Sequence, residues 1–344
     1  MIEIQEQVLL GPYTTFGIGG PARYFVTVTT PEELVQAVEF ARARGMAMFV
    51  LGGGSNLLVG DAGFDGLVIR MALRAATVRV GEEYEVAAGT EWDGFVRAVC
   101  EEGISGVECL AGIPGLVGGS PIQNIGAYGQ EVAETIVSVT ALEAVTLRFV
   151  ALERGACGFG YRRSIFNSTE RGRYIVTGVR FRFSREGRVK LAYADLQRHF
   201  AGHAEPSPIE VYHAVRGIRQ GKGMLLVEGD ADSRSAGSFF KNPVVPEAVV
   251  GRIAGELGLD VGAVPRWAAG DGMVKLPAAW LLERAGFAKG FAMGRAGISS
   301  RHTLALINRG GASFAEMTAL RDRIVGVVEE RFGVRLEQEP VLVN

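Results

Sequence analysis

Residues 46–58 read MAMFVLGGGSNLL, an apolar hexapeptide that runs directly into a glycine loop. The hexapeptide predicts a buried strand. A helix is predicted over 31–44, because Thr30 can cap its start, Pro31 suits its first turn and Gly45 follows its last turn. The order is therefore helix, strand and glycine loop. Clustered glycines mark places where the backbone turns sharply or approaches a ligand closely.

A second glycine loop, residues 112–129, reads GIPGLVGGSPIQNIGAYG. Backbone N–H groups in such loops can form nests that bind the oxygens of a pyrophosphate. Four neutral side chains in the two loops can form hydrogen bonds with the ribityl or base groups of a ligand: Ser55, Asn56, Gln123 and Asn124. The alternative is a pair of tight turns in a β-rich domain. Two loops this rich in small polar residues favour a ligand site over that alternative.

Two other sequence patterns, one for a dinucleotide site and one for a metal site, are incomplete. Residues 17–22 formally match the G-x-G-x-x-A fingerprint, but that fingerprint needs a helix after it. Here Pro21 and a β-rich stretch follow, so no Rossmann domain is predicted. His199 and His203 lie four residues apart without the intervening Glu of a zinc motif, and no third ligand is evident. We predict a surface pair and no metal site.

The composition excludes several classes of protein. A chain of 344 residues suggests two or three domains. The 36 Lys and Arg nearly balance the 38 Asp and Glu, and no basic stripe predicts a nucleic-acid partner. No apolar run predicts a membrane span, and the N-terminus lacks a signal-peptide pattern. The three cysteines form no CxxC pair, which favours a reducing cytoplasm and thiols buried in the core.

Periodicity outlines the rest of the chain. Strands are predicted over 66–70 and 84–88, and a helix over 91–102 that Gly103 ends. Residues 135–183 are β-rich, and Pro206 and Pro208 mark a break. Beyond the break we predict an α+β unit, with helices near 208–220, 246–257, 277–285 and 313–331 and a strand over 302–308.

Residues 237–243, Gly-Ser-Phe-Phe-Lys-Asn-Pro, combine a hydroxyl, a cation and an amide behind two aromatic rings. That combination suits chemistry on an anionic substrate in a pocket that excludes water. Taken alone, the heptad could equally be a strand edge that runs into a proline turn.

Together these motifs are similar to the UDP-N-acetylenolpyruvoylglucosamine reductase family. The similarity runs essentially end to end. Besides the two loops and the heptad, it is carried by TFGI at 15–18, YRRSIF at 161–166, AAWLLERAG at 278–286 and FGVRLEQE at 332–339.

The resemblance implies an α+β fold in three parts. Two α+β subdomains, 1–66 and 67–205, would form an FAD-binding fold of the vanillyl-alcohol-oxidase type. A C-terminal α+β domain, 206–344, would bind the substrate, and its tail would return to the active site. FAD would be bound non-covalently through Gly52, Gly53, Gly54, Ser55, Asn56, Leu57, Ile113, Pro114, Gly115, Gly118, Gly119, Gln123, Asn124, Gly126, Ala127 and Tyr128.

The resemblance also implies the activity. NADPH would reduce the flavin and leave, and a nucleotide-sugar enolpyruvyl ether would then enter the same cleft, in a ping-pong cycle that makes UDP-N-acetylmuramate for peptidoglycan. Arg162 and Glu339 would flank the substrate carboxylate, and Ser238 would donate the proton. Further substrate contacts would be Tyr161, Tyr193, Lys222, Lys241, Asn242 and His302. For Tyr161 and Tyr193 core packing is the alternative, and Lys222 precedes a loop that is longer than in some members of the family. We expect a cytoplasmic monomer.

Two rival functions remain. One is an oxidase or dehydrogenase of the same flavin fold that acts on an alcohol or a phenol, and the heptad and Glu339 argue against it. The other is a nucleotide-sugar binding protein without activity, which the presence of Ser238, Arg162 and Glu339 disfavours.

Overall fold

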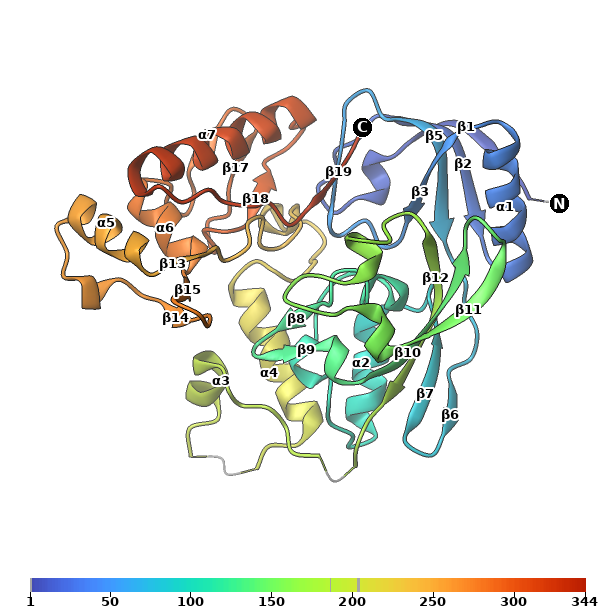
Figure 1. Cartoon of the computed structure of the whole chain (residues 1–344), viewed down its shortest axis with the longest axis horizontal. Coiled ribbons are helices and arrows are strands. Elements are labelled where there is room, and N and C mark those ends of the chain that lie inside the picture. The colour runs from blue at the N-terminus through green and yellow to red at the C-terminus, as the bar shows by residue number, and fades with distance from the viewer. Residues whose placement is uncertain (1, 186, 203–204) are drawn as a thin grey trace. The chain divides into compact units, whose positions relative to one another are not determined.

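The computed structural model describes residues 2–185, 187–202 and 205–344 (Figure 1). The chain forms two compact units. Unit 1 consists of 1–8, 22–54 and 65–220, and unit 2 consists of 9–21, 55–64 and 221–344. His203, one member of the histidine pair discussed above, lies outside the described residues. Among the helices of the described part, none is long and apolar enough to cross a membrane.

The first sheet of unit 1 carries the strand that leads into the first glycine loop. Its strand order is β1 (Gln5–Leu9), β2 (Pro21–Val28), β5 (Phe64–Met71) and β3 (Ala47–Leu51). Helix α1 (Pro31–Ala43) begins with a capping box between Thr30 and Glu33, as its sequence predicts. It lies beside this sheet (Figure 1), and its Leu34 and Val38 pack with Val26, Leu67 and Ile69 in one core.

One detail of this region differs from expectation and another agrees with it. Strand β3 was expected to be buried, but only Leu51 is, because β3 lies at the edge of its sheet and pairs with β5 alone. By contrast, strand β2 begins at Pro21, directly after the G-x-G-x-x-A stretch. No helix follows that stretch, which confirms that it is not a Rossmann turn.

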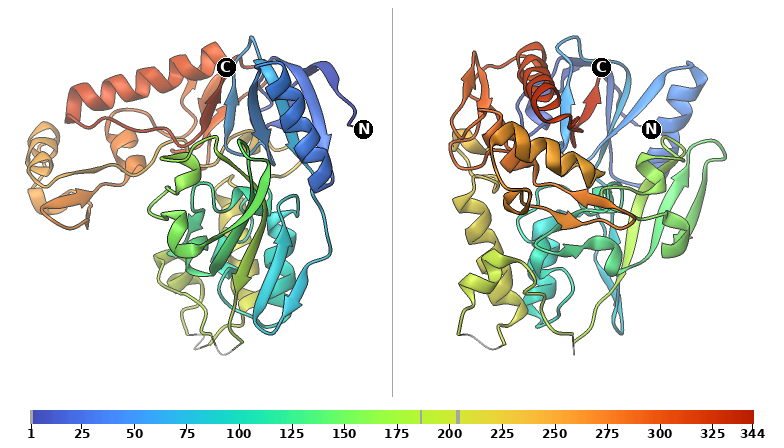
Figure 2. Two further views of the ribbon diagram at one scale, coloured as in Figure 1. Left: turned by 45° about the vertical axis from the view of Figure 1, so that its right-hand side comes forward. Right: turned by 60° about the vertical axis from the view of Figure 1, so that its left-hand side comes forward.

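The second sheet of unit 1 is antiparallel. Its order is β11 (Arg148–Glu153), β10 (Ile136–Glu143), β12 (Tyr174–Arg182), β7 (Glu83–Ala87) and β6 (Val78–Val80). Its core side packs with α2 (Trp92–Glu101) and α4 (Pro208–Gly221) in one hydrophobic cluster (Figure 2). The alternation expected over 135–183 breaks at Leu147, which turns the β10–β11 hairpin with φ of 58°. Short elements complete the unit: β8 (Gly126–Ala127), β9 (Gln130–Glu131) and α3 (Ala194–His199).

Unit 2 holds three α-helices around one core. They are α5 (Ala248–Leu257), α6 (Ala278–Arg284) and α7 (Phe314–Phe332), the long red helix of Figure 2. The capping box of Ser313 and Glu316 predicted the start of α7 correctly. The strands are β13 (Val244–Pro246), β15 (Met273–Lys275) and β14 (Trp267–Ala268); β16 (Ala292–Met293), β17 (Ala296–Ile298) and β18 (Leu306–Asn308); and β19 (Val341–Val343) beside β4 (Leu57–Val59).

The strand expected over 302–308 is shorter than predicted. It begins only at Leu306, because a turn precedes it in which the N–H of Ala305 donates to the carbonyl of His302 at 3.1 Å. The apolar run TLALI therefore enters the core partly as turn and partly as strand.

Gly63 should be one of the most sensitive positions for stability. Its φ is +82°, and a Cβ there would lie 1.8 Å from the carbonyl oxygen of Pro21. We expect Gly63→Ala to lower the free energy of unfolding by about 3 kcal/mol or more, since it adds a backbone clash to left-handed strain. Gly45→Ala is the matched control, because Gly45 has φ of +62° and open space around it. The control should cost about 1 kcal/mol. Urea denaturation measures both free energies of unfolding. Equal losses in Gly63→Ala and Gly45→Ala would show that the clash with Pro21 adds no cost.

Candidate active site

The two glycine loops touch within unit 1. A Cβ on Gly53 would lie 2.6 Å from the Cα of Gly115, so the two backbones approach more closely than any side chain would allow. A Cβ on Gly118 would in turn lie 2.6 Å from the Cβ of Ala88. These glycines are needed for packing, and they fix the second loop against the first loop and against the end of β7.

Gly52 and Gly119 are different. Both are exposed, neither has a left-handed backbone, and no heavy atom lies within 4 Å of the Cβ that either would carry. Neither conformation nor protein packing therefore requires glycine there. Glycine at these two positions leaves the backbone open to the close approach of a ligand. The two loops thus fit a cofactor that lies along their backbones.

Arg162 is held beside the second loop. Its Nη2 donates to the carbonyl of Gly126 at 2.9 Å, in the hairpin formed by β8 and β9. Its backbone has φ of 52°, a left-handed conformation that costs a residue with a Cβ about 1 to 2 kcal/mol. The Nδ2 of Asn167 donates to the Arg162 carbonyl at 3.1 Å and supports this turn. The bond to Gly126 fixes where the guanidinium lies, and Asn167 supports the turn that carries it.

Asn124 shapes the second loop through its side chain. Its Nδ2 donates to Glu131 at 2.8 Å and to the carbonyl of Gly160 at 3.0 Å, and its Oδ1 accepts from the N–H of Ala133 at 3.1 Å. The residue is buried, so these protein groups engage its whole amide. Asn124 therefore joins the loop to the turn that carries Arg162.

The two tyrosines predicted to contact substrate are exposed. Tyr161 is 44% and Tyr193 47% exposed, so neither is a core residue, and the packing alternative fails for both. The ring of Tyr193 lies edge-on to that of Tyr128, with centroids 5.3 Å apart. Tyr128 is buried in the second loop, and burial raises the pKa of its hydroxyl to about 12.

In unit 2 the heptad lies alongside the C-terminal tail. Phe239 and Phe240 are buried in the core, which anchors the segment on either side of them. The N–H of Glu339 donates to the carbonyl of Phe239 at 2.8 Å, and the N–H of Lys241 donates to that of Glu337 at 2.9 Å. This ladder places Ser238 and Glu339, about 100 residues apart in the sequence, on adjacent backbone segments.

The first glycine loop also reaches this tail. The chain passes from unit 1 to unit 2 between Gly54 and Ser55. The Nδ2 of Asn56 donates to the carbonyl of Glu339 at 3.3 Å, and the N–H of Val341 donates to the carbonyl of Asn56 at 2.9 Å. Strand β4 then continues in parallel with β19. Asn56 thus holds the backbone of Glu339.

The remaining substrate candidates lie in unit 2 with protein partners. The Nζ of Lys241 lies 3.1 Å from a carboxylate oxygen of Glu337, and the Oδ1 of Asn242 accepts from the N–H of Ala278 at 2.9 Å, at the start of α6. The residue after Lys222 lies close to the residue before His302, because a Cβ on Gly223 would lie 3.0 Å from the Nε of Arg301. The segments that carry Lys222 and His302 are therefore in contact.

Sequence patterns missed two residues that hold the second loop. An Asp93 oxygen accepts from the N–H of Gly112 at 2.5 Å, and the Nε of Arg219 donates to the carbonyl of Gly112 at 3.1 Å. Arg219 is buried, and burial lowers the pKa of its guanidinium. A signal existed: Arg219 follows the buried Val211 and Val215 at helical spacing, so a charge continues an apolar stripe.

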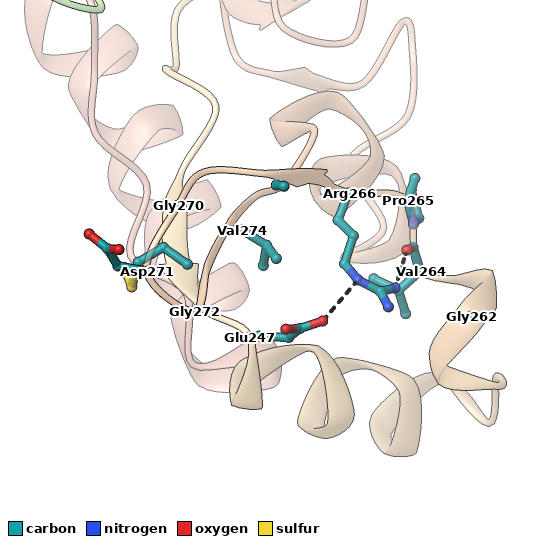
Figure 3. Close-up of a pocket in the computed structure, with 11 residues that line it drawn as sticks. Glu247, Gly262, Val264, Pro265, Arg266, Gly270, Asp271, Gly272 and Val274 are labelled. Carbon is teal, nitrogen blue, oxygen red and sulfur yellow. Dashed lines mark hydrogen bonds and ion pairs between the residues drawn. The ribbon is translucent and has the colours of Figure 1, made fainter.

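A cavity of about 660 Å³ in unit 2 does not coincide with these residues (Figure 3). It lies beside β14 and β15. Two residues of its lining form an ion pair, with the Nε of Arg266 3.8 Å from the Oε1 of Glu247. None of the predicted site residues lines it. Within the described ranges no group of three or more His, Cys, Asp or Glu is arranged to hold a metal ion.

Comparisons with known proteins bear on both units. Residues 22–147 match the model of an FAD binding domain, and residues 230–343 match that of the C-terminal domain of UDP-N-acetylenolpyruvoylglucosamine reductase. The chain is 44% identical to the protein of that name from Thermobifida fusca, over 98% of both chains. It is 45% identical to the one from Streptomyces coelicolor, over 97% of this chain and 89% of the relative.

A solved structure agrees with these matches. The crystal structure of UDP-N-acetylenolpyruvylglucosamine reductase from Thermus caldophilus matches the whole of both chains with a TM-score of 0.70 and 28% identity. The FAD-binding α+β fold expected from the sequence is confirmed by this structure and by the FAD binding domain.

Proposed function

The chain belongs to the UDP-N-acetylenolpyruvoylglucosamine reductase family, and we propose on that premise that it reduces the enolpyruvyl group of UDP-N-acetylglucosamine enolpyruvate to UDP-N-acetylmuramate with NADPH. The observation that carries this proposal is the ladder between the heptad and the tail, which sets the backbone of Ser238 beside that of Glu339. Both segments lie in the matched C-terminal domain.

We propose that FAD binds along the two glycine loops, where Gly52 and Gly119 leave the backbone uncovered by protein. When bound, the flavin supplies hydride transfer in two separate half-reactions, from NADPH and then to the vinyl ether. The Gly53 and Gly115 contact keeps the two loops together. Asp93, Arg219 and Asn124 hold the second loop in place.

Three side chains carry the proposed chemistry. Hydride addition to the β-carbon of the vinyl ether sends charge toward the carboxylate, so a fixed donor there stabilises the transition state. Arg162 supplies this donor, and the bond of its Nη2 to the Gly126 carbonyl keeps the guanidinium in place. Ser238 gives its proton to the α-carbon. Glu339, in the C-terminal tail, flanks the substrate carboxylate. The Nδ2 of Asn56 donates to the backbone carbonyl of Glu339.

The remaining assignments complete the proposal. Subdomains 1–66 and 67–205 hold FAD, and 206–344 binds the substrate through Lys222, Lys241, Asn242 and His302, with Tyr161 and Tyr193 contributed by the second subdomain. The exposure of Tyr161 and Tyr193 supports contact with a ligand. We propose a cytoplasmic monomer, in keeping with three free, buried cysteines.

An NADPH oxidation assay tests the function directly. NADPH should be consumed rapidly only when the enolpyruvyl nucleotide sugar is present, with one product formed per NADPH. Oxidation that depends on oxygen and ignores the nucleotide sugar would instead support an oxidase of the same fold. A purified protein without flavin absorbance and without turnover would support a binding protein.

The flavin should be released completely by acid precipitation. Cys109 is the cysteine nearest the second loop, but it is fully buried, and burial raises the pKa of its thiol to about 12. Almost no thiolate is then available to form a covalent link. The measurement is the absorbance of the supernatant and of the washed pellet. A yellow pellet would show a covalent tether.

A further inference from the structure

Glu108 is a fully buried carboxylate just before the second glycine loop. Its Oε2 accepts from the N–H of Gly106 at 2.6 Å. Its Oε1 accepts from the Nε2 of Gln130 at 3.3 Å and from the N–H of Lys190 at 3.2 Å. A buried charge is costly unless donors surround it. One carboxylate therefore joins three segments that are far apart in the sequence.

Two of these segments lead to the predicted site. Gln130 lies in β9, opposite Ala127 of β8, and the loop of that hairpin carries Tyr128. Lys190 comes three residues before Tyr193. Glu108 thus lies between the hairpin of the cofactor loop and the segment that bears the exposed tyrosine.

The segment 190–193 rests on this hairpin along its length. The thiol of Cys109 donates to the carbonyl of Lys190 at 3.3 Å. The Cβ of Ala192 lies 3.4 Å from where a Cβ on Gly129 would be, and the Tyr193 ring meets that of Tyr128. Glu108 and Cys109 hold the backbone at one end of the segment, and Tyr128 contacts its other end.

The hairpin has supports that do not involve Glu108. Asn124 accepts from Ala133 and donates to Glu131, and the strands β8 and β9 pair directly. The Lys190 segment, by contrast, has no regular secondary structure before α3. Losing an acceptor at Glu108 should therefore disturb residues 190–193 more than the hairpin.

We propose that Glu108 is a positioning residue that holds Tyr193 for contact with the nucleotide-sugar substrate. The inference rests on the proposed function, and it assigns to Glu108 no contact with any reacting group. Its loss should weaken binding of the nucleotide sugar and leave the rate of flavin reduction at saturating NADPH unchanged.

Glu108→Gln tests this proposal, because it keeps the size of the side chain but leaves one acceptor oxygen for three donors. We expect KM for the nucleotide sugar to rise about tenfold, the loss that an unsatisfied buried donor brings. The stopped-flow rate of flavin reduction at saturating NADPH and the Kd for FAD should stay within about twofold. A purely structural defect would change all three quantities together.

A double-mutant cycle with Tyr193→Ala identifies the route of the effect. If Glu108 acts through Tyr193, Glu108→Gln should raise KM by less than about twofold in the Tyr193→Ala background. Fully additive effects would overturn the proposal. Glu134→Gln is the matched control, because Glu134 binds the Nζ of Lys190 at 2.5 Å on the surface and leaves the buried bonds intact. Glu134→Gln should change neither the KM for the nucleotide sugar nor the Kd for FAD.

Wild-type enzyme offers a further test if Glu108→Gln does not fold. Amide hydrogen exchange at Lys190 should slow when the nucleotide sugar saturates the enzyme, because the bound ligand and Glu108 hold the same segment. Exchange that is indifferent to the nucleotide sugar would overturn the inference. Absence of turnover in the wild type would contradict the proposed function itself, which separates the two failures.

Discussion

Ser238→Ala should leave flavin reduction by NADPH intact and slow the return of the oxidised flavin by about 100- to 10,000-fold, the usual worth of general acid catalysis. The first half-reaction needs no proton from the serine, whereas reduction of the vinyl ether needs one at the α-carbon. In stopped-flow traces the flavin should bleach at the wild-type rate and regain colour very slowly when the enolpyruvyl nucleotide sugar is added.

A loss of stability must be separated from this effect. Ser313→Ala is a suitable control, because it removes the cap of α7 and should cost about 1 kcal/mol without touching the reaction. It should leave both half-reactions near the wild-type rate. If Ser238→Ala also leaves both near that rate, Ser238 is not the proton donor, and Glu339 or a bound water becomes the candidate.

Arg162→Lys should lower turnover by about 100-fold or more, the cost of removing a preorganised donor at a developing charge. A guanidinium can hold a carboxylate through two parallel bonds, whereas an ammonium is a point charge. Lysine also has a Cβ, so the strain at φ of 52° should not change. The effect should therefore come from the lost geometry of the donor, and steady-state kinetics with the nucleotide sugar measure it.

The adjacent Arg163 provides the control for this substitution. It is exposed and lies outside the proposed chemistry, so Arg163→Lys should change turnover by less than about threefold. A similarly small change in Arg162→Lys would show that Arg162 does not lie at the developing charge.

Local chemistry determined the parts of this protein that could be predicted from its sequence. The capping residues of α1 and α7 satisfy helix N–H groups within a few residues, so Thr30 and Ser313 marked both starts correctly. Likewise the β-rich stretch after Pro21 argued against the helix that the dinucleotide fingerprint requires, and β2 does begin there. The heptad and the two glycine loops stood out because their residue types are unusual together.

Only the tertiary structure decided which of those residues meet. The ladder that joins Phe239 to Glu339 links residues separated by most of the C-terminal unit, and no periodicity records such a pairing. Sequence also could not distinguish Gly53, which packs on Gly115, from Gly119, which faces open space. Nor could it show that Glu108 lies at the junction of three segments. Propensity and capping act over a few residues, whereas burial and hydrogen-bond partners depend on how distant segments pack.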